Sequence, residues 1–309
     1  MSNIKREKAL GKARRFILGV RFTDGLIFKL IIYLLLISIG FVFVYPLLHM
    51  VSYSFQSLED LLNPQIGYVP SRLYLGSYRE AFRTLNYFKT FGTTLLVTLL
   101  PALLQTIVAS FIGYGFARFE FKGKKLFMAL LIATYIIPPQ VTMIPRYVMY
   151  TEMGLINNLL SVLLPASLGQ GLYSAIFVLI FYQFYKMIPK VLDEAAQIDG
   201  ASRAYIYFRI AVPLSKPSFI TVFLFSFVWY WNETYFASLF MGGGKYDTLL
   251  LKLLNFNSAY EKVFGDDNLI NEGTTMSATL LIILPLLIVY FILQKQFIEG
   301  IDKAGITGE

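Results

Sequence analysis

The sequence contains no cysteine and a single histidine, His49, among its 309 residues. Without cysteine there is no disulfide, no thiolate nucleophile, no iron–sulfur cluster and no cysteine-bound zinc. One histidine leaves any metal site to carboxylates and excludes a histidine-based catalytic triad. Redox chemistry and most hydrolytic chemistry therefore lack their usual residues.

Charge is also scarce, with 15% charged against 56% hydrophobic residues and a mean hydropathy of +0.61. A transmembrane helix needs about 20 apolar residues, at about 1.5 Å per residue, to cross roughly 30 Å of hydrocarbon. Six runs meet this length: 30–48, 90–117, 126–145, the later part of 154–185 from about residue 160, 217–241 and 274–294. A β-barrel would show segments of about ten residues with alternating polarity, and the sequence contains none. We predict an all-α polytopic membrane protein with six transmembrane helices.

The positions of Lys and Arg predict the orientation, because cytoplasmic flanks carry the excess of positive charge. Under a topology with both termini in the cytoplasm, 19 of the 27 Lys and Arg residues fall inside. We divide the chain into a basic cytoplasmic segment (1–29), a six-span domain (30–294) and a cytoplasmic tail (295–309). The net charge of +8 then reflects topology and attraction to anionic lipid headgroups of the bilayer, and we expect no nucleic acid partner.

Three connections are long: predicted outer loops at 49–89 and 242–273, and a predicted inner loop at 186–216. The inner loop is too polar to span a membrane, and its sequence predicts two short helices. Pro189 suits a first helical turn, Asp199-Gly200 marks a break, and Ser202 can cap a second helix that ends before Pro213.

The two predicted inner-loop helices each have a distinctive face. Leu192, Ala195, Ala196 and Asp199 form a narrow face of the first helix, where small side chains allow a partner to approach closely. In the second, we expect Tyr205, Phe208 and Ile210 to pack against the spans. An amphipathic hairpin lying on the lipid headgroups is the alternative.

The inner loop also carries a motif. Glu194-Ala195-Ala196, Asp199-Gly200, Ile210 and Pro213 match the pattern EAA, three residues, G, nine residues, I-x-L-P, with Val212 in place of the usual leucine. This pattern resembles that of the inner-membrane permease subunits of binding-protein-dependent ABC importers. Further segments resemble the carbohydrate-uptake branch, similar to the maltose-type second permease: 137–145, 154–157, 182–189, 231–236 and 297–301. Residues 305–309 depart from the usual ending of that family.

The resemblance implies a type I ABC importer permease fold, in a bacterial or archaeal cell (inner) membrane. It implies a second homologous permease subunit as heterodimer partner, two copies of a cytoplasmic ATP-binding subunit, and an extracellular or periplasmic solute-binding protein that delivers a carbohydrate, such as an oligosaccharide. The residues implied in coupling to the ATPase are Glu194, Ala195, Ala196, Asp199, Gly200, Ile210 and Pro213. The chain has no G-x-x-x-x-G-K-[ST] loop, so we expect ATP and Mg on the partner subunits, no bound cofactor here, and no enzyme activity.

A candidate substrate path lies in the fifth predicted span. A carboxylate inside a span is costly, so Glu233 is expected to face protein or water. Trp229, Asn232, Glu233 and Phe236 follow the i, i+3, i+4, i+7 spacing of one helical face. Aromatic faces and hydrogen-bonding groups together suit a sugar. The alternative is an aromatic belt at the membrane interface, formed with Tyr230, Trp231 and Tyr235.

Other polar and breaking residues have more than one explanation. Pro138, Pro139 and Pro145 break or kink the third span, for transport or only for packing. Gln105, Gln140 and Gln183 suit interhelical hydrogen bonds better than ligand contacts. Asp266, Asp267 and Glu272 suggest a solvated acidic loop, since no EF-hand spacing is present. Residues 242–245 form only a partial phosphate-loop pattern and suit a plain turn.

Three other functions stay open at this point. A permease for another small solute shares every feature above. An ion-coupled secondary transporter requires intramembrane carboxylates in several spans and often an internal repeat, whereas only Glu233 is available. A membrane-embedded transferase or hydrolase requires paired carboxylates or a metal cluster near the bilayer.

Overall fold

The computed structural model describes residues 25–242, 244–265 and 270–305, with side chains up to residue 295 in the last helix. Within these ranges the chain is helical and contains no strand, which confirms the predicted fold class. The expectations for residues 1–24, Gly243, 266–269, 306–309 and the side chains of 297–301 lie outside what is described. The chain divides into two compact units, Met1–Tyr78 with Asn271–Ser277 and Arg79–Ile270 with Ala278–Glu309.

The first unit is dominated by one long helix, α2 (Leu26–Ser54). Its middle is apolar and exposed, as at Leu34, Ile37 and Phe43. A run of exposed apolar side chains of this length is suited to lipid or to a partner chain. The predicted first span, 30–48, thus lies inside a longer helix that also takes up the start of the predicted outer loop.

The segment after α2 folds onto itself around α3 (Leu58–Leu62). The Ser71 hydroxyl donates to Asp60 Oδ1 at 2.6 Å and lowers the pKa of that carboxyl, while Gln56 Nε2 donates to the Gly67 carbonyl at 2.8 Å. The segment 49–89, predicted as an outer loop, is therefore not a continuous loop but contains helices. Besides the end of α2 it contains α3, α4 (Gly76–Leu85) and the start of the next long helix.

The second unit is built around α5 (Tyr87–Arg118), against which α9 and α13 pack most extensively. Its other helices are, in chain order, α6 (Lys124–Ile136), α7 (Pro139–Glu152), α8 (Leu160–Ser167), α9 (Ser174–Met187), α10 (Lys190–Ile198), α11 (Arg203–Ile206), a π-helical turn (Tyr207–Ala211), α12 (Val212–Leu214), α13 (Lys216–Asn232), α14 (Tyr235–Met241), α15 (Leu249–Leu254) and α16 (Phe256–Phe264). The last helix, α17 (Glu272–Gly305), and α4 have residues in both units.

Small and hydroxyl-bearing residues give α5 a face that other helices approach closely. At Gly113 a Cβ atom would lie 2.6 Å from Phe181 Cβ and 2.9 Å from the Tyr182 nitrogen, so only glycine admits α9 there. The buried threonines need no outside partner, because Thr94 and Thr106 each donate to the carbonyl four residues earlier. Close packing through small residues is typical of helices in membranes.

Three helices of the described chain are long and apolar enough to cross a membrane, namely α2, α5 and the part of α17 up to residue 295. Three bent pairs also qualify if each is one span: α6 with α7 (93°), α9 with α10 (69°), and Arg203–Leu214 with α13 (76°). The structure therefore has three to six candidate spans, and the predicted six is the upper value.

Two predicted spans are not the continuous helices expected. The run 126–145 breaks at Ile137 and Pro138, because proline disfavours helix in the residue before it and lacks a backbone donor. The fourth span begins at Ser174 and not near residue 160, because a loop at 168–173 separates α8 from α9. Both breaks line the cavity described below.

Candidate functional site

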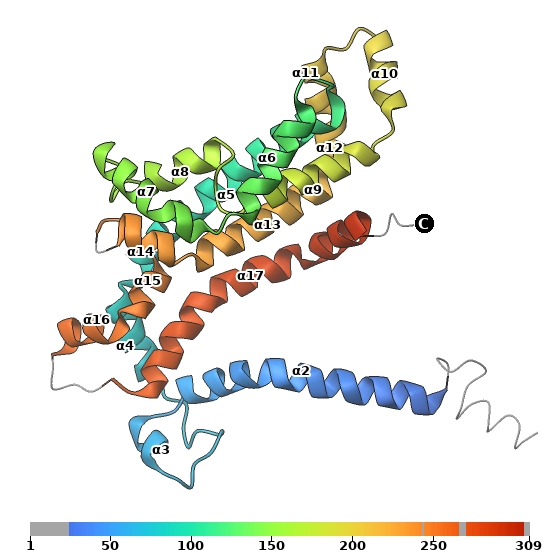
Figure 1. Cartoon of the computed structure of the whole chain (residues 1–309). Helices are drawn as coiled ribbons and strands as arrows, with labels where there is room; N and C mark the ends of the chain where they lie inside the picture. The colour runs from blue at the N-terminus through green and yellow to red at the C-terminus, as the bar shows by residue number, and fades with distance from the viewer. Residues whose placement is uncertain (1–24, 243, 266–269, 306–309) are drawn as a thin grey trace, which may run out of the picture. The chain divides into compact units, whose positions relative to one another are not determined.

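The inner-loop motif forms a hairpin of short helices, residues 190–214, which we call the hairpin; it projects from one end of the second unit (Figure 1). Gly200 has a φ of +82°, a left-handed conformation that favours glycine, and lets the chain reverse after α10. The Ser202 hydroxyl then accepts the Tyr205 N–H at 3.2 Å and caps α11. The predicted break and cap are confirmed, and Pro189 takes the N-cap position just before α10.

The return leg of the hairpin differs from the prediction in two ways. Helix continues past Pro213 to Leu214, since proline is tolerated in the first turn of α12. The buried residues are Ile206, Tyr207 and Ala211, whereas the side chains predicted to pack inward are not buried: Tyr205 and Phe208 are exposed and Ile210 is half-buried. The π-helical turn adds a residue to one turn, so the buried face shifts relative to a regular helix.

A largely buried ion pair fixes the hairpin to the last residue of α5. Arg118 Nε lies 3.2 Å from Asp193 Oδ2, with side chains 5% and 14% exposed. Arg118 Nη2 also donates to the Ile188 carbonyl at 2.9 Å. On the return leg, the Arg203 guanidinium lies 5.0 Å from the centre of the Phe119 ring. Both legs are therefore held at residues 118 and 119.

A buried hydroxyl cluster holds the base of the return leg. The Ser110 hydroxyl lies 2.6 Å from the Tyr185 hydroxyl and 2.8 Å from the Tyr207 hydroxyl, and Ser215 donates to Tyr185 at 3.2 Å. The cluster joins α5, α9, the π-helical turn and the bend before α13. Each hydroxyl in this apolar environment has a partner, which gives the hairpin a defined position relative to the bundle.

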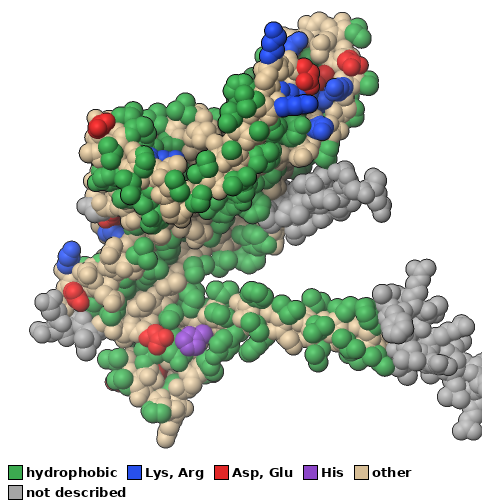
Figure 2. All heavy atoms as spheres, in the orientation of Figure 1, with side chains coloured by type: hydrophobic (Ala, Val, Ile, Leu, Met, Phe, Trp, Pro, Cys, Tyr) green, Lys and Arg blue, Asp and Glu red, His purple; other side chains and the backbone are tan. Residues whose placement is uncertain are grey.

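The remaining motif residues lie at the surface. Glu194, Ala195, Asp199 and Gly200 are exposed and Ala196 is half-buried, and no residue of α10 is buried. The same helix exposes three apolar side chains, Val191, Leu192 and Ile198. On the return leg Pro213 is exposed. Figure 2 shows Lys, Arg, Asp and Glu side chains gathered at this end of the second unit.

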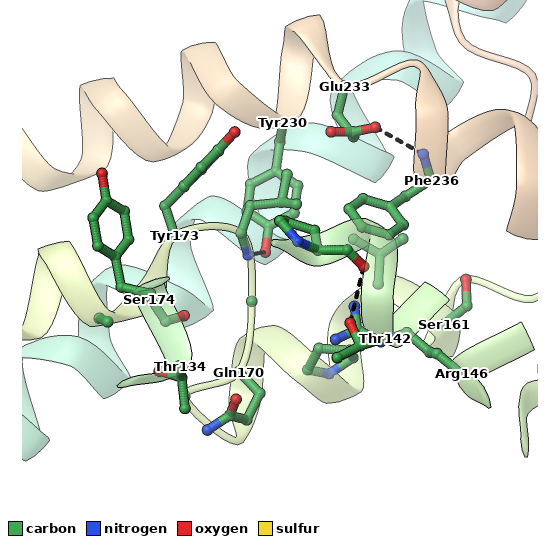
Figure 3. A pocket seen from close by; sticks show the side chains of 18 of the residues that line it. Thr134, Thr142, Arg146, Ser161, Gln170, Tyr173, Ser174, Tyr230, Glu233 and Phe236 are labelled. Atoms are coloured by element: carbon green, nitrogen blue, oxygen red, sulfur yellow. Dashed lines mark hydrogen bonds between the residues drawn. The ribbon is translucent and has the colours of Figure 1, made fainter. Parts of the chain in front are cut away.

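A second feature is a cavity of about 280 Å³, lined by residues that precede and follow the hairpin in the sequence. Its walls come from the α6–α7 break, α8, the loop 168–173, the end of α13 and α14 (Figure 3). Those segments are the ones where the predicted spans are interrupted. Irregular backbone at membrane depth is tolerated where it is buried in protein or lines a cavity.

Hydrogen bonds fix one wall of the cavity. Tyr230 donates to Gln105 Oε1 at 2.7 Å, Gln105 Nε2 donates to the Leu172 carbonyl at 2.6 Å, and the Leu172 N–H donates to the Tyr230 oxygen at 3.3 Å. Gln105 thus makes the interhelical hydrogen bond expected of it. A Cβ atom at Gly171 would overlap both Gln105 Oε1 and the Tyr230 hydroxyl, so this wall requires glycine there.

The polar side chains that line the same cavity include those of Thr134, Thr142, Arg146, Ser161, Gln170, Ser174 and Glu233. Glu233 Oε1 accepts the Phe236 N–H at 2.7 Å, and the Arg146 guanidinium lies 5.6 Å from the centre of the Phe236 ring. The cavity therefore combines charged, hydroxyl and aromatic groups.

The predicted helical face of Trp229, Asn232, Glu233 and Phe236 is wrong as a single face, because α13 ends at Asn232 and α14 begins at Tyr235. Glu233 and Phe236 line the cavity, but Trp229 and Asn232 do not. Trp229 packs on Tyr173 and Phe177, and Asn232 donates to its own helix at Val228. Arg146, Ser161 and Ser174 were not predicted; the glycines at 169 and 171 are a sequence signal for the break just before Ser174.

The fold and these two features define a class: a polytopic helical membrane protein with an exposed helical hairpin and a cavity that has polar groups in its lining. Residues 105–303 match the family described as the binding-protein-dependent transport system inner membrane component. The chain belongs to this family. It is a permease subunit of an ABC importer and an inner-membrane component, and its family implies binding-protein and ATPase partners.

Two curated relatives and one solved structure show how far the similarity extends. The melibiose/raffinose/stachyose import permease MelC of Bacillus subtilis is 33% identical over 240 residues, covering 77% of this chain and 83% of that protein. The arabinooligosaccharides transport permease AraQ of Halalkalibacterium halodurans is 27% identical, covering 88% and 96%. A chain in the crystal structure of a bacterial ABC transporter involved in alginate import matches with a TM-score of 0.73 at 21% identity, covering 88% and 96%. That match shows the fold.

Proposed function

We propose that this permease carries a carbohydrate, such as an oligosaccharide, in an importer whose ATP hydrolysis takes place on partner subunits. The names of MelC and AraQ support the solute class, since both are named for the transport of sugars. The partners in this proposal are a second homologous permease, two copies of an ATP-binding subunit that bind ATP and Mg, and a binding protein that delivers the sugar.

The exposed α10 carries the coupling part of this proposal. Glu194 and Ala195 of its motif are exposed, while Asp193, on the side of the helix opposite Ala195, is held by Arg118. A helix that is rigidly attached on one side and open on the other suits the transfer of movement from a docked subunit. We assign ATPase docking to Glu194, Ala195, Ala196, Asp199 and Gly200, and positioning of the return leg to Ile210 and Pro213.

A pair of tryptophan variants on α10 tests the docking role. Residues 195 and 197 are both exposed, and at about 100° per residue they lie on opposite sides of the helix. Ala195→Trp is expected to abolish co-purification of the ATP-binding subunit, because the new side chain obstructs the close approach. Gln197→Trp is the matched control and is expected to retain it. Equal retention in both variants would contradict the docking assignment.

The proposed topology places both termini and the hairpin in the cytoplasm. Because the chain has no cysteine, single cysteines at Gln65 and Ser202 report their sides without background. Gln65→Cys is expected to react with a membrane-impermeant maleimide in whole cells, and Ser202→Cys only after permeabilisation. The reverse pattern would overturn the orientation.

For the substrate path we retain Glu233 and Phe236, which line the cavity, and give Trp229 and Asn232 supporting positions outside it. Glu233→Gln is expected to lower sugar uptake per assembled complex, since a buried polar contact is worth about 1–3 kcal/mol when one partner is removed. Asn232→Leu is expected to transport at a rate near that of the wild type. A larger loss with Asn232→Leu would reverse this assignment.

A further inference from the structure

The cavity contains two buried hydroxyls with no hydrogen-bond partner among the described residues, those of Ser161 and Ser174. Their residues are 3% and 5% exposed. A buried hydroxyl without a partner costs free energy, so most such groups in native proteins are paired with protein or with water. Figure 3 shows the two serines on different sides of the cavity. A ligand between them would supply what both lack.

The groups around these serines suit a polyhydroxylated ligand. Each serine hydroxyl can donate and accept, Glu233 offers carboxylate oxygens, and Arg146 offers guanidinium N–H groups. The Arg146 side chain packs over Phe236, and no carboxylate of the residues that the structure describes lies within 4.0 Å of it. Phe236 and Tyr173 add aromatic surface beside the polar groups. This combination pairs with sugar hydroxyls and packs against sugar C–H groups.

We propose that this cavity is a sugar-binding subsite, in which the Ser161 and Ser174 hydroxyls hydrogen-bond one sugar unit of the solute. The volume of about 280 Å³ lies just below the range of about 300–1,000 Å³ typical of small-molecule pockets, so it suits one unit and not a whole oligosaccharide. This inference rests on the proposed function, because it requires that the solute is a carbohydrate.

The subsite is preorganised on its loop side. Gln105 and Tyr230 hold the Leu172 backbone, and Ser174 follows two residues later as the first residue of α9. On the other side, Ser161 is fixed within α8. A site whose groups are already in position loses less entropy when it binds its ligand. The two serines therefore act as direct contacts, and Gln105 and Tyr230 act as positioning residues.

The test measures uptake by the complete importer in proteoliposomes, with its binding protein in excess and a panel of melibiose, raffinose, stachyose and arabinooligosaccharides. The sugar that the wild-type complex imports fastest is then used for Ser161→Ala, Ser174→Ala and the double variant. Ser226→Ala is the matched control, because Ser226 is also buried without a described hydroxyl partner but does not line the cavity.

We expect each serine variant to lower uptake at saturating sugar by roughly two- to tenfold, and the double variant by more. Complex yield is expected to stay as in the wild type, and Ser226→Ala is expected to keep wild-type uptake. Wild-type uptake in all three variants would overturn the subsite and leave the hydroxyls bound to water only. An equal loss in Ser226→Ala would also overturn it. If the wild type imports no sugar of the panel, the carbohydrate assignment fails, and the subsite fails with it.

Discussion

The hairpin joint and the cavity wall attach to the same helix by different chemistry. The joint, by which the hairpin attaches to the end of α5, consists of the Arg118–Asp193 ion pair and the contact of the Arg203 guanidinium with the Phe119 ring. At Gln105, 13 residues earlier, the wall uses an amide, a phenol and backbone groups, none of them charged. At about 1.5 Å per residue the two attachments are roughly 20 Å apart along α5.

The difference follows from the cost of burying charge. The Arg118–Asp193 pair at the end of α5 is largely buried, so each charge depends on the other for compensation, and separating the two is costly. Deeper in an apolar bundle, neutral hydrogen bonds hold a backbone loop without that cost. The same helix, α5, thus holds the hairpin at its end and supports one wall of the cavity 13 residues earlier.

Breaking the joint is expected to have the largest effect. Asp193→Ala leaves the Arg118 guanidinium buried without its carboxylate, and loss of one partner of a buried pair costs about 3–5 kcal/mol. We expect a lower unfolding midpoint of the purified complex and loss of uptake. The double variant Arg118→Met with Asp193→Leu is expected to recover much of the midpoint. A single variant as stable as the wild type would show that the joint contributes little.

A methyl group at position 171 is expected to disrupt the wall next most strongly. Gly171→Ala forces the Gln105 amide or the Tyr230 ring to move, and overpacking of this kind costs about 1–3 kcal/mol. Uptake is expected to fall, while the ATP-binding subunit still co-purifies, because the hairpin is untouched. Gly115→Ala on α5 is the matched control, since a Cβ there meets no other atom within 4 Å.

Removing one hydroxyl from the wall is expected to have a smaller effect. Tyr230→Phe leaves Gln105 Oε1 without its donor and the Leu172 N–H without its acceptor, at a cost of about 1–3 kcal/mol. A double-mutant cycle with Gln105→Met, read from unfolding midpoints, is expected to show non-additivity, since each residue acts through the other. Strict additivity would mean that the two side chains are independent.

The smallest effect is expected at a second ion pair close to the joint. Lys124 lies 2.8 Å from Glu120, whose carboxyl is 87% exposed, and the Lys124 ammonium holds the pKa of Glu120 below its usual range. Any stabilisation would be present above the usual carboxyl pKa and lost as the pH falls through the lowered one. Water screens the exposed Glu120 carboxylate, so Glu120→Gln, which leaves the hydrogen bond from Lys124 to the Phe119 carbonyl in place, is expected to leave uptake and the unfolding midpoint unchanged between about pH 5 and 8.

Local signals explain why the hairpin was largely predictable. Gly200 and Ser202 each act within a few residues, and the motif itself is continuous, so the break and the cap could be predicted directly. The π-helical turn could not, because Tyr207, its first residue, contacts Ser110, 97 residues away in the sequence, and no local pattern brings the two together. The sequence therefore predicted that Tyr205 and Phe208 pack inward, whereas Ile206 and Tyr207 are the buried residues in the structure.

The cavity required information that no local pattern contains. Hydropathy identified the runs 126–145 and 154–185, but it does not distinguish a straight span from a broken one. Pro138 and the glycines at 169 and 171 marked the breaks, and only the fold brings those breaks together beside Glu233. Ser161 and Ser174 could not be singled out, since the sequence contains many serines, and these two are distinguished by burial without a partner together with a place in the cavity lining.

Site-specific crosslinking tests the central claim, that α10 is the docking surface of this permease, most directly. A cysteine in place of Ala195 is unique in the chain, and so is one in place of Val69, an exposed residue of the segment between α3 and α4. With a short thiol-to-amine reagent on the assembled importer, Ala195→Cys is expected to crosslink to the ATP-binding subunit and Val69→Cys is not. No crosslink from Ala195→Cys, or an equal one from Val69→Cys, would contradict the claim.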